Sequence, residues 1–372
     1  MESRALIFIP DISGYTKFIT ETENKHAKHL ITELLEVIIN ADNLKMHVSE
    51  IEGDAVLFYR KGDPPKLDEL IEQAKRMFLD FHTHLKIIQR DNVCQCGACR
   101  SAVNLTLKFV SLYGTLEEVT IQNFSKIMGS DVILAHRLLK NNIDSNEYLL
   151  ITGDHFTTQN YSGSGLDEWV LFHEHKESFD NFEEVQIKYL PLTEVKKELP
   201  DVSQLKRSDL EYTNPDISIF IDAPLMLVHE MLTDNIAKLE YVPDLKEVKN
   251  SHAVNRVNSS HTCVFEDLEV HFVTKFNEVK EKEISYIEEG EASIGIAFIS
   301  DYKLKEEGNG TRLSLKTFPG RISKNSAFYK RFFYSIMTKL ALSKLKKGST
   351  KNLEIIKNYC EKIAEERAKK II

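Results

Sequence analysis

The sequence predicts an α+β protein built from two domains. A chain of 372 residues is long for one domain, so two domains are the natural expectation. The first half alternates short apolar strand patterns with amphipathic helix patterns, which is typical of a sheet covered by helices. The second half contains alternating apolar runs at hairpin spacing and then one long helical pattern, which indicates an antiparallel sheet with a helix packed on it.

The overall composition excludes several classes of protein. Hydrophobic residues make up 42% of the chain and aromatic residues 9%, as in an ordinary globular protein with a real core. The formal net charge of −9 argues against general nucleic-acid binding. No run approaches the ~18 apolar residues that a membrane span needs, and the N-terminus lacks the layout of a signal peptide. These observations predict a cytoplasmic protein without a membrane span.

Two apolar, strand-like stretches each deliver one aspartate at a turn. The first is LIFIPDISGYTKFIT, in which we expect the strand to end at Pro10, Asp11 to lie in the turn, and Ser13-Gly14 to open a helix. The second is EIEGDAVLF, in which Gly53-Asp54 joins two apolar segments as a hairpin. If the two strands lie side by side, Asp11 and Asp54 meet at one edge. Two carboxylates near a helix N-terminus suit a divalent cation and the phosphates that it carries.

These two stretches together resemble the catalytic domain of class III nucleotide cyclases. In that family two aspartates hold two metal ions, Mg²⁺ or Mn²⁺, and the resemblance places them at Asp11 and Asp54. The backbone turn that cradles the triphosphate corresponds to Ile12, Ser13, Gly14 and Tyr15. The residue four before the second aspartate helps to choose the purine, and Glu50 is the choice found in guanylate cyclases. The resemblance therefore implies a purine nucleotide as ligand, and a homodimer with the site at its interface.

A plainer interpretation exists for each stretch taken alone. A buried strand followed by Asp-x-Ser-Gly is also a common helix N-cap, and Gly-Asp is a common hairpin turn. The two stretches occur in the expected order, with a helix of fitting length between them, which favours cyclase ancestry. Ancestry does not fix activity.

The segment from Phe124 to Lys140 resembles the cyclase helix that carries an asparagine and an arginine. Arg137 corresponds to the arginine, which stabilises the pentavalent phosphate in the family. Ile133 occupies the place of the asparagine that orients the ribose, and an isoleucine cannot form that hydrogen bond. Lys126 occupies the second purine-selecting position, where the family has aspartate, threonine or cysteine. The family's late lysine, which contacts the triphosphate, has no convincing match.

Three of the five cysteines are clustered between the Asp54 hairpin and the segment from Phe124 to Lys140. Cys94, Cys96 and Cys99 form a Cys-x-Cys-x-x-Cys knuckle, in a loop before a strand, that can wrap a soft metal such as zinc. A zinc site usually needs a fourth ligand from elsewhere. A structural disulfide is the weaker alternative, and three thiols in a turn remain a third interpretation. Cyclases in general lack this insertion, which resembles a feature of an uncharacterised bacterial cyclase-like family.

The second half resembles the START-like, or polyketide-cyclase-like (SRPBCC), superfamily. Its first strand leads into Asp222-Ala223-Pro224 and then the short helix Leu225–Thr233. The expected strands are His261–Phe265, Glu269–Phe276, Lys282–Glu288, Ala292–Leu304 and Thr311–Phe318, and the expected long helix is Ser326–Lys346. The resemblances together imply a ferredoxin-like nucleotide-cyclase domain followed by a helix-grip domain, in which a curved antiparallel sheet and a helix enclose a cavity for a small hydrophobic ligand.

The predicted organisation has four parts. Residues 1–192 form the cyclase-like domain, 193–213 a polar linker, 214–350 the START-like domain, and 351–372 a solvated helical tail that packs on either domain or on a partner. Three functions compete: an active class III cyclase, a cyclase-derived nucleotide- and metal-binding module without catalysis, and a binder of lipids or small hydrophobes whose first domain is only a scaffold. The second is favoured, because the metal aspartates are kept whereas the ribose-orienting asparagine and the late lysine are not.

Overall fold

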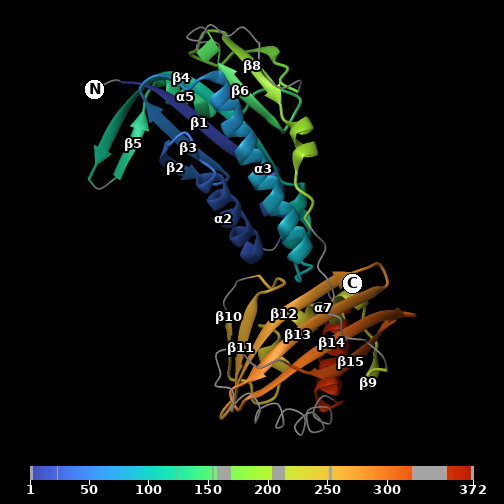
Figure 1. Cartoon of the computed structure of the whole chain (residues 1–372). Helices are drawn as coiled ribbons and strands as arrows, with labels where there is room; N and C mark the ends of the chain where they lie inside the picture. Colours follow the sequence, from blue (N-terminus) through green and yellow to red (C-terminus); the bar gives the residue numbers. More distant parts are fainter. Residues whose placement is uncertain are drawn as a thin grey trace. The chain divides into compact units, whose positions relative to one another are not determined.

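The structure is a computed structural model that describes residues 3–22, 24–122, 124–152, 155–156, 169–202, 214–250, 254–320 and 350–369. The chain divides into two compact units, each with its own hydrophobic core (Figure 1). The first contains a mixed sheet with helices, and the second contains a separate antiparallel sheet with helices, among them a C-terminal helix. The predicted α+β class is therefore confirmed.

The first unit is built on a sheet in the order β2-β3-β1-β4-β6-β8-β7, with β5 paired to the far end of β4. Strands β4 and β6 are parallel, and the other neighbouring pairs are antiparallel. The strands are β1 (Ser3–Ser13), β2 (His47–Glu52), β3 (Ala55–Lys61), β4 (Thr106–Ile121), β5 (Phe124–Met128), β6 (Tyr148–Thr152), β7 (His173–Glu177) and β8 (Val185–Pro191).

Strand β1 is central and buried on both faces. Its side chains alternate between the two faces, as the period of a strand requires. Ile7 and Ile9 face α5 (Ser130–Leu138), whose Val132 belongs to the same core cluster. Helices α2 (Asn24–Asn40) and α3 (Leu67–Asp91) lie along the sheet in Figure 1. The short elements of this unit are α1 (Tyr15–Glu21), α4 (Gly97–Ser101), η1 (Ala102–Asn104) and η2 (Thr193–Glu198).

Strand β1 continues through Pro10 to Ser13, so the expectation that it ends at Pro10 is wrong. Proline lacks only the N–H donor, and a strand can tolerate that loss where pairing to one neighbour lapses. Pairing of β1 with β3 skips from Phe8 to Asp11, whereas pairing with β4 runs unbroken through Pro10. Asp11 is consequently held within a strand, with neighbours on both sides, and not in a loose turn.

The other element boundaries of this unit follow from its packing. The apolar pattern over Phe18–Met46 predicts one long helix, possibly two, and the structure contains two, α1 and α2. The segment from Phe124 to Lys140 is strand β5 followed by α5, separated by Gly129 at φ 145°. Strand β4 continues beyond Gly114 to Ile121 because β5 pairs with its last residues. The cysteine loop contains a short helix, α4.

The second unit is a seven-stranded antiparallel sheet in the order β10-β11-β12-β13-β14-β15-β9. Its strands are β9 (Ile217–Ile221), β10 (Glu247–Asn250), β11 (Ser260–Val264), β12 (Glu269–Val279), β13 (Glu283–Ala292), β14 (Ile296–Glu307) and β15 (Gly310–Pro319). Helices α7 (Leu225–Thr233) and α8 (Lys238–Tyr241) follow β9. The first strand of the unit thus pairs with the last, and all five predicted runs are strands.

The C-terminal tail forms a helix over residues 350–369. Leu353, Ile356 and Cys360 are buried in the core of the second unit, so the tail is not fully solvated. Arg367 forms an ion pair with Glu230 of α7, with 2.7 Å between its Nη2 and Oε1. The predicted long helix Ser326–Lys346 lies outside the described residues.

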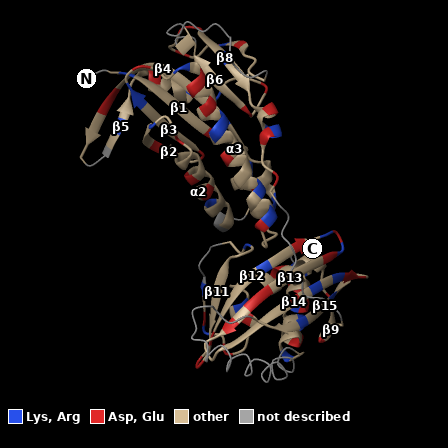
Figure 2. Cartoon of the chain, in the orientation of Figure 1, with Lys and Arg blue, Asp and Glu red and all other residues tan. Residues whose placement is uncertain are grey.

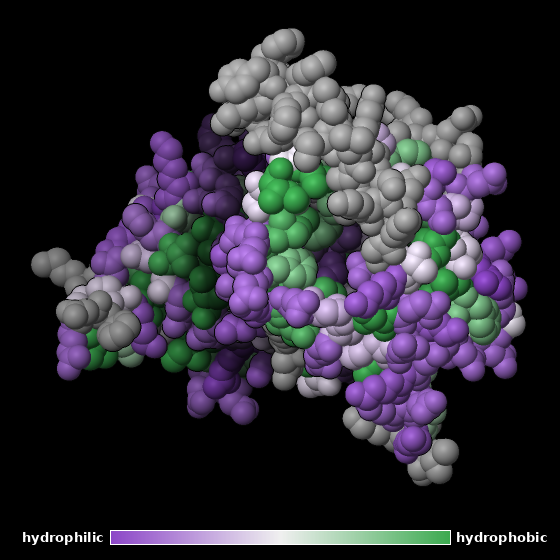
Figure 3. All heavy atoms as spheres, turned by 90° about the horizontal axis from the view of Figure 1, so that it is seen from below, coloured by the Kyte–Doolittle hydropathy of each residue, from purple (hydrophilic) through white to green (hydrophobic). Residues whose placement is uncertain are grey.

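Surface chemistry is mixed over the described part of the chain. Lys and Arg alternate with Asp and Glu along α3 and over the second sheet (Figure 2). On the face seen in Figure 3, small groups of hydrophobic side chains lie between hydrophilic ones, which is ordinary for a globular surface. None of the helices in the described ranges is long and apolar enough to cross a bilayer.

Candidate functional site

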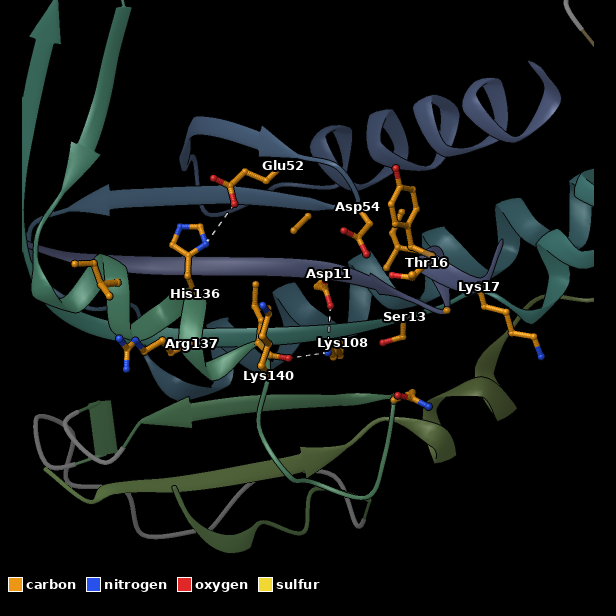
Figure 4. A pocket seen from close by; sticks show the side chains of 17 residues that line it. Asp11, Ser13, Thr16, Lys17, Glu52, Asp54, Lys108, His136, Arg137 and Lys140 are labelled. Carbon is orange, nitrogen blue, oxygen red and sulfur yellow. Dashed lines mark hydrogen bonds and ion pairs between the residues drawn. The ribbon is translucent and has the colours of Figure 1, made fainter. Parts of the chain in front are cut away.

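The centre of the candidate site is the pair of aspartates on adjacent strands. Asp11 of β1 is in register with Ala55 of β3, and Asp54 lies in the two-residue turn between β2 and β3. Gly53 precedes it at φ 62°, a conformation that glycine adopts without strain. The N–H of Ile12 donates a hydrogen bond to the carbonyl oxygen of Asp54 (3.0 Å), which fixes the turn against β1. Figure 4 shows both carboxylates directed to the same space.

The two carboxylates repel each other in partly desolvated surroundings. Burial and, to a lesser extent, the negative charge of Asp11 raise the pKa of Asp54 to about 6. Burial also raises the pKa of Asp11, against the opposing effect of Lys108. Two hard oxygen ligands whose repulsion Lys108 relieves only in part are a donor set that a Mg²⁺ or Mn²⁺ ion fits, since a divalent cation reduces that repulsion.

The aspartates open into a cavity of about 890 Å³. One wall is the turn Ile12, Ser13, Gly14 and Tyr15, where Gly14 has φ 89° and caps α1. The opposite wall is the solvent face of α5 and the residues after it. The remaining charged groups on the wall are Lys17, Glu52, Lys108, His136, Arg137 and Lys140. A cavity of this size is within the range of small-molecule and cofactor sites.

Helix α5 contributes Ile133, His136 and Arg137 to the cavity wall. Ile133 has 53% of its surface exposed, so it is not required by the core. Arg137 is turned away from the aspartates in Figure 4. Its Nη1 donates to the carbonyl oxygen of Asp180 (2.7 Å), and its guanidinium lies over the ring of Phe182 at 5.4 Å.

The two residues expected to select the purine are not on this wall as the described residues form it. Lys126 is exposed on β5 and pairs with Val119 of β4. Glu50 of β2 is half-buried, and its carboxylate lies within 4.8 Å of ligand atoms of Glu52 and His136. The base-selecting residues and the aspartates of one chain are therefore not gathered in one cavity.

Lys108 is the main residue of the site that the sequence did not indicate. It lies on β4 directly beside Asp11, and its Nζ is 3.2 Å from the Oδ2 of Asp11. The same ammonium donates to the carbonyl oxygen of Leu139 (2.9 Å). The pairing register of β1 with β4 places Lys108 beside Asp11, and the sequence around Asp11 does not reveal that register. Glu52, His136 and Lys140 were also missed; the β2–β3 hairpin brings Glu52 to the cavity, and the packing of α5 brings His136 and Lys140.

The three clustered cysteines are brought together with a histidine. Ligand atoms of His26, Cys94, Cys96 and Cys99 all lie within 4.8 Å of one another, an arrangement consistent with a zinc site. The Sγ of Cys99, which is buried, is 3.7 Å from the Nδ1 of His26 at the start of α2. In the sequence, His26 and His29 are three residues apart and are candidates for metal ligands or for a solvated helical face, with the latter favoured. The structure places His26 beside the cysteines.

Comparison with known proteins gives matches over parts of the chain. Residues 31–148 match a sequence family described as "Protein of unknown function (DUF2652)". The "Uncharacterized protein Rv2561/Rv2562" of Mycobacterium tuberculosis is 34% identical over 122 residues, which are 33% of this chain and 57% of that protein. The chain thus spans little more than half the length of this relative.

Solved structures of nucleotide cyclases are similar at low identity. The adenylyl cyclase CyaB from P. aeruginosa has a TM-score of 0.37 and 17% identity, over 57% of this chain and 98% of that one. The guanylate cyclase domain of RhGC from Catenaria anguillulae, in complex with GTP, has a TM-score of 0.37 and 16% identity, over 51% of this chain and 97% of that one.

Proposed function

We propose that the first unit is a cyclase-derived module that binds a purine nucleotide together with Mg²⁺ or Mn²⁺, and that it is catalytically weak or inactive. The observation that carries this proposal is the pair Asp11 and Asp54, held together at the mouth of a cavity of about 890 Å³. The turn from Ile12 to Tyr15 is on the same wall and is in the place where the resemblance puts the triphosphate.

One feature supports weak or absent catalysis. Ile133 offers no hydrogen bond to a ribose, and comparable removals of one polar contact in enzymes cost about a hundredfold in rate. Arg137 contacts Asp180 and Phe182 of its own chain, so the phosphate contact of the family would have to come from a second copy. An active class III cyclase that converts GTP or ATP to a cyclic nucleotide is the alternative, in which a second chain supplies these contacts.

The experiment is to incubate the protein with Mn²⁺ and GTP or ATP, and to measure both cyclic product and the melting temperature. The proposal expects the nucleotide to raise the melting temperature with little or no product, and expects Asp54→Ala to remove the shift. Rapid product formation that Asp54→Ala abolishes would favour the active cyclase. No shift and no product would leave the first unit as a scaffold.

We propose further that two copies of the chain form a homodimer that shares the site. Glu50 and Lys126 do not line the cavity of the aspartates in their own chain, and Arg137 is held by Asp180 and Phe182, as expected for a site shared between two copies. Large apolar side chains are exposed on β2, at the β4–β5 hairpin and on α5: Ile51 at 51%, Ile121 at 61%, Met128 at 46% and Ile133 at 53%. Light scattering on the wild type and on Ile51→Glu tests this, and a monomeric wild type at micromolar concentration would contradict it.

We also propose that His26, Cys94, Cys96 and Cys99 bind one zinc ion. With Zn–S bonds of about 2.3 Å and Zn–N bonds of about 2.0 Å, a tetrahedral site places sulfur and nitrogen about 3.5 Å apart. The Cys99 Sγ and His26 Nδ1 are 3.7 Å apart. Three cysteines and one histidine fill a tetrahedral site without an open position, which makes the role structural.

Elemental analysis of protein purified without chelators tests the zinc site. One zinc per chain is expected, with strong loss in His26→Ala and Cys99→Ser. His29→Ala is the matched control, because His29 is one turn further along α2 and pairs with Glu33 at 3.1 Å. Zinc content below one tenth per chain in the wild type, or equal loss in His29→Ala, would refute the assignment.

For the second unit we propose a START-like fold that binds a small hydrophobic ligand. Its seven-stranded antiparallel sheet, with the first strand beside the last and two short helices after β9, supports this assignment. Extraction and mass spectrometry of the purified protein should find an apolar small molecule. If this unit carries one and the first unit binds no nucleotide, the protein is a lipid or small-hydrophobe binder with a scaffold domain.

A further inference from the structure

Lys108 places a fixed positive charge inside the aspartate site. Its ammonium is 3.2 Å from the Oδ2 of Asp11 and is held in place by the carbonyl oxygen of Leu139 at 2.9 Å. The side chain is only 17% exposed, and it comes from the strand adjacent to β1 in the middle of the sheet. Such a lysine has little freedom to move away from Asp11.

The ammonium of Lys108 is paired with Oδ2 of Asp11, an oxygen that would be a ligand of a second metal ion. A second divalent ion bound at Oδ2 of Asp11 would face the positive charge of Lys108 at short range, which disfavours it. Asp54 and the other oxygen of Asp11 remain available to one ion. An ammonium has three N–H donors, and the described residues supply two acceptors, Asp11 and Leu139. The third donor is left for a phosphate oxygen.

The charge of the cavity wall is compatible with a single ion. Its cationic residues are Lys17, Lys108, Arg137 and Lys140, and its acidic residues are Asp11, Glu52 and Asp54. Four positive and three negative groups give a net charge of +1 before any metal is bound. One divalent ion raises this to +3, and a nucleoside triphosphate carries about −4 when ionised. One ion together with Lys108 therefore brings the loaded site within one charge of neutrality, and no second ion is needed for that balance.

We propose that Lys108 takes the place of one of the two cations, so that the site holds a single divalent ion and Lys108 contacts the polyphosphate of the nucleotide directly. This inference rests on the proposed nucleotide and metal binding of the first unit. Lys108 is then a residue that binds the nucleotide, and its charge on β4 determines how many metal ions the site holds.

The test counts Mn²⁺ ions per chain in the presence of GTP, by equilibrium dialysis and by the electron paramagnetic resonance of free Mn²⁺. Zinc-saturated protein is used, and Asp54→Ala provides the blank for Mn²⁺ bound elsewhere. The wild type should bind one ion above the blank. Lys108→Met, which removes the charge and keeps the length, should bind two, or bind Mn²⁺ without nucleotide about tenfold more tightly. Lys108→Arg should behave as the wild type.

Lys17→Met is the matched control, because Lys17 is exposed on the same cavity wall and has no contact with Asp11 among the interactions described. Circular dichroism checks that each variant is folded. Two ions in the wild type, the same stoichiometry and affinity in Lys108→Met, or the same change in Lys17→Met would overturn the role of Lys108 alone. Absence of Mn²⁺ above the blank in every protein would instead overturn the proposed function, and this inference with it.

Discussion

Among single residues, Ile133 is the position where the site departs most clearly from its cyclase resemblance. The side chain is 53% exposed on the cavity wall, so a polar replacement costs the fold little. We predict that Ile133→Asn raises cyclic-nucleotide formation by about tenfold to a hundredfold over the wild type, because it restores a hydrogen bond that acts in the transition state. Product formed with Mn²⁺ and GTP measures the effect.

Ile133→Ala is the control for this prediction, since it opens the same space without providing a donor or acceptor. Equal rates for the alanine and asparagine variants would show that a ribose contact at this position is not what limits turnover. Unchanged rates in both, with nucleotide still bound, would place the limitation at Arg137, which is held by Asp180 and Phe182.

Asp54 illustrates how a binding group can cost stability. Its pKa is about 6 in the folded chain, against an ordinary value of 3.8, because burial and Asp11 disfavour the charge. Between pH 4 and 6 the folded state therefore holds more protons than the unfolded state, and stability falls as pH rises through this window. Above pH 6 the ionised Asp54 lowers the free energy of unfolding by its full amount. For a half-exposed group this amount is about 1 kcal/mol after solvent screening.

We predict that Asp54→Asn raises the melting temperature of the metal-free protein at pH 7.5, and that this gain shrinks as the pH falls from 6 to 4. Thermal denaturation across that range measures it. Asp63→Asn, at an exposed aspartate near the next turn, should show no such pH-dependent gain. A gain of equal size at pH 4 and pH 7.5 would mean that the effect does not come from the ionised carboxylate.

At the level of helices and strands, local pattern predicted most elements but not their register. Alternation and turn residues identified the β2–β3 hairpin and five strands of the second sheet, because those signals are contained in a few neighbouring residues. The end of β1 was predicted wrongly from Pro10. Proline usually interrupts a strand, but here the pairing of β1 with β4 continues through it. Lys108 and His26 were missed because their partners are set by strand register and by helix packing, which no local motif encodes.

The second sheet contains a buried ion pair that we expect to matter for its stability. Lys238 of α8 and Glu288 of β13 are 11% and 6% exposed, with 3.5 Å between the Nζ and Oε1. The hydroxyl of Tyr286 donates to the same carboxylate at 2.6 Å. Glu288→Ala leaves the lysine buried without its counter-charge, and we predict a loss of about 3 kcal/mol in unfolding free energy. Chemical denaturation measures the loss.

The double variant Lys238→Met with Glu288→Leu tests the cause of that loss. It removes both charges and keeps most of the volume, so we expect it to recover most of the stability that the single variant loses. A double variant as unstable as Glu288→Ala would mean that the hydrogen bond from Tyr286, and not the unpaired charge, carries the effect.

For the molecule as a whole, each unit has its own core, so a ligand of the first unit should act on that unit alone. The first core is formed by residues such as Ile7, Val110 and Leu150, and the second by residues such as Val228, Tyr286 and Leu313. Independent cores give independent unfolding transitions when the units are separate domains. The chain has one tryptophan, Trp169, and it belongs to the first unit. Its fluorescence therefore reports on the unit that contains the aspartates.

We predict that Mn²⁺ with GTP at about a hundred times its dissociation constant stabilises the first unit by about 2.7 kcal/mol, which raises the midpoint seen by Trp169 fluorescence by about 5–10 °C. Far-ultraviolet circular dichroism follows the backbone of both units, and its second transition, the one that does not coincide with the Trp169 fluorescence change, should not move. Asp54→Ala should abolish the fluorescence shift, whereas Glu288→Ala should lower only the second transition. If both transitions move together on adding nucleotide, or Glu288→Ala lowers the fluorescence midpoint as well, the two units are energetically coupled. The nucleotide site would then be able to communicate with the second sheet.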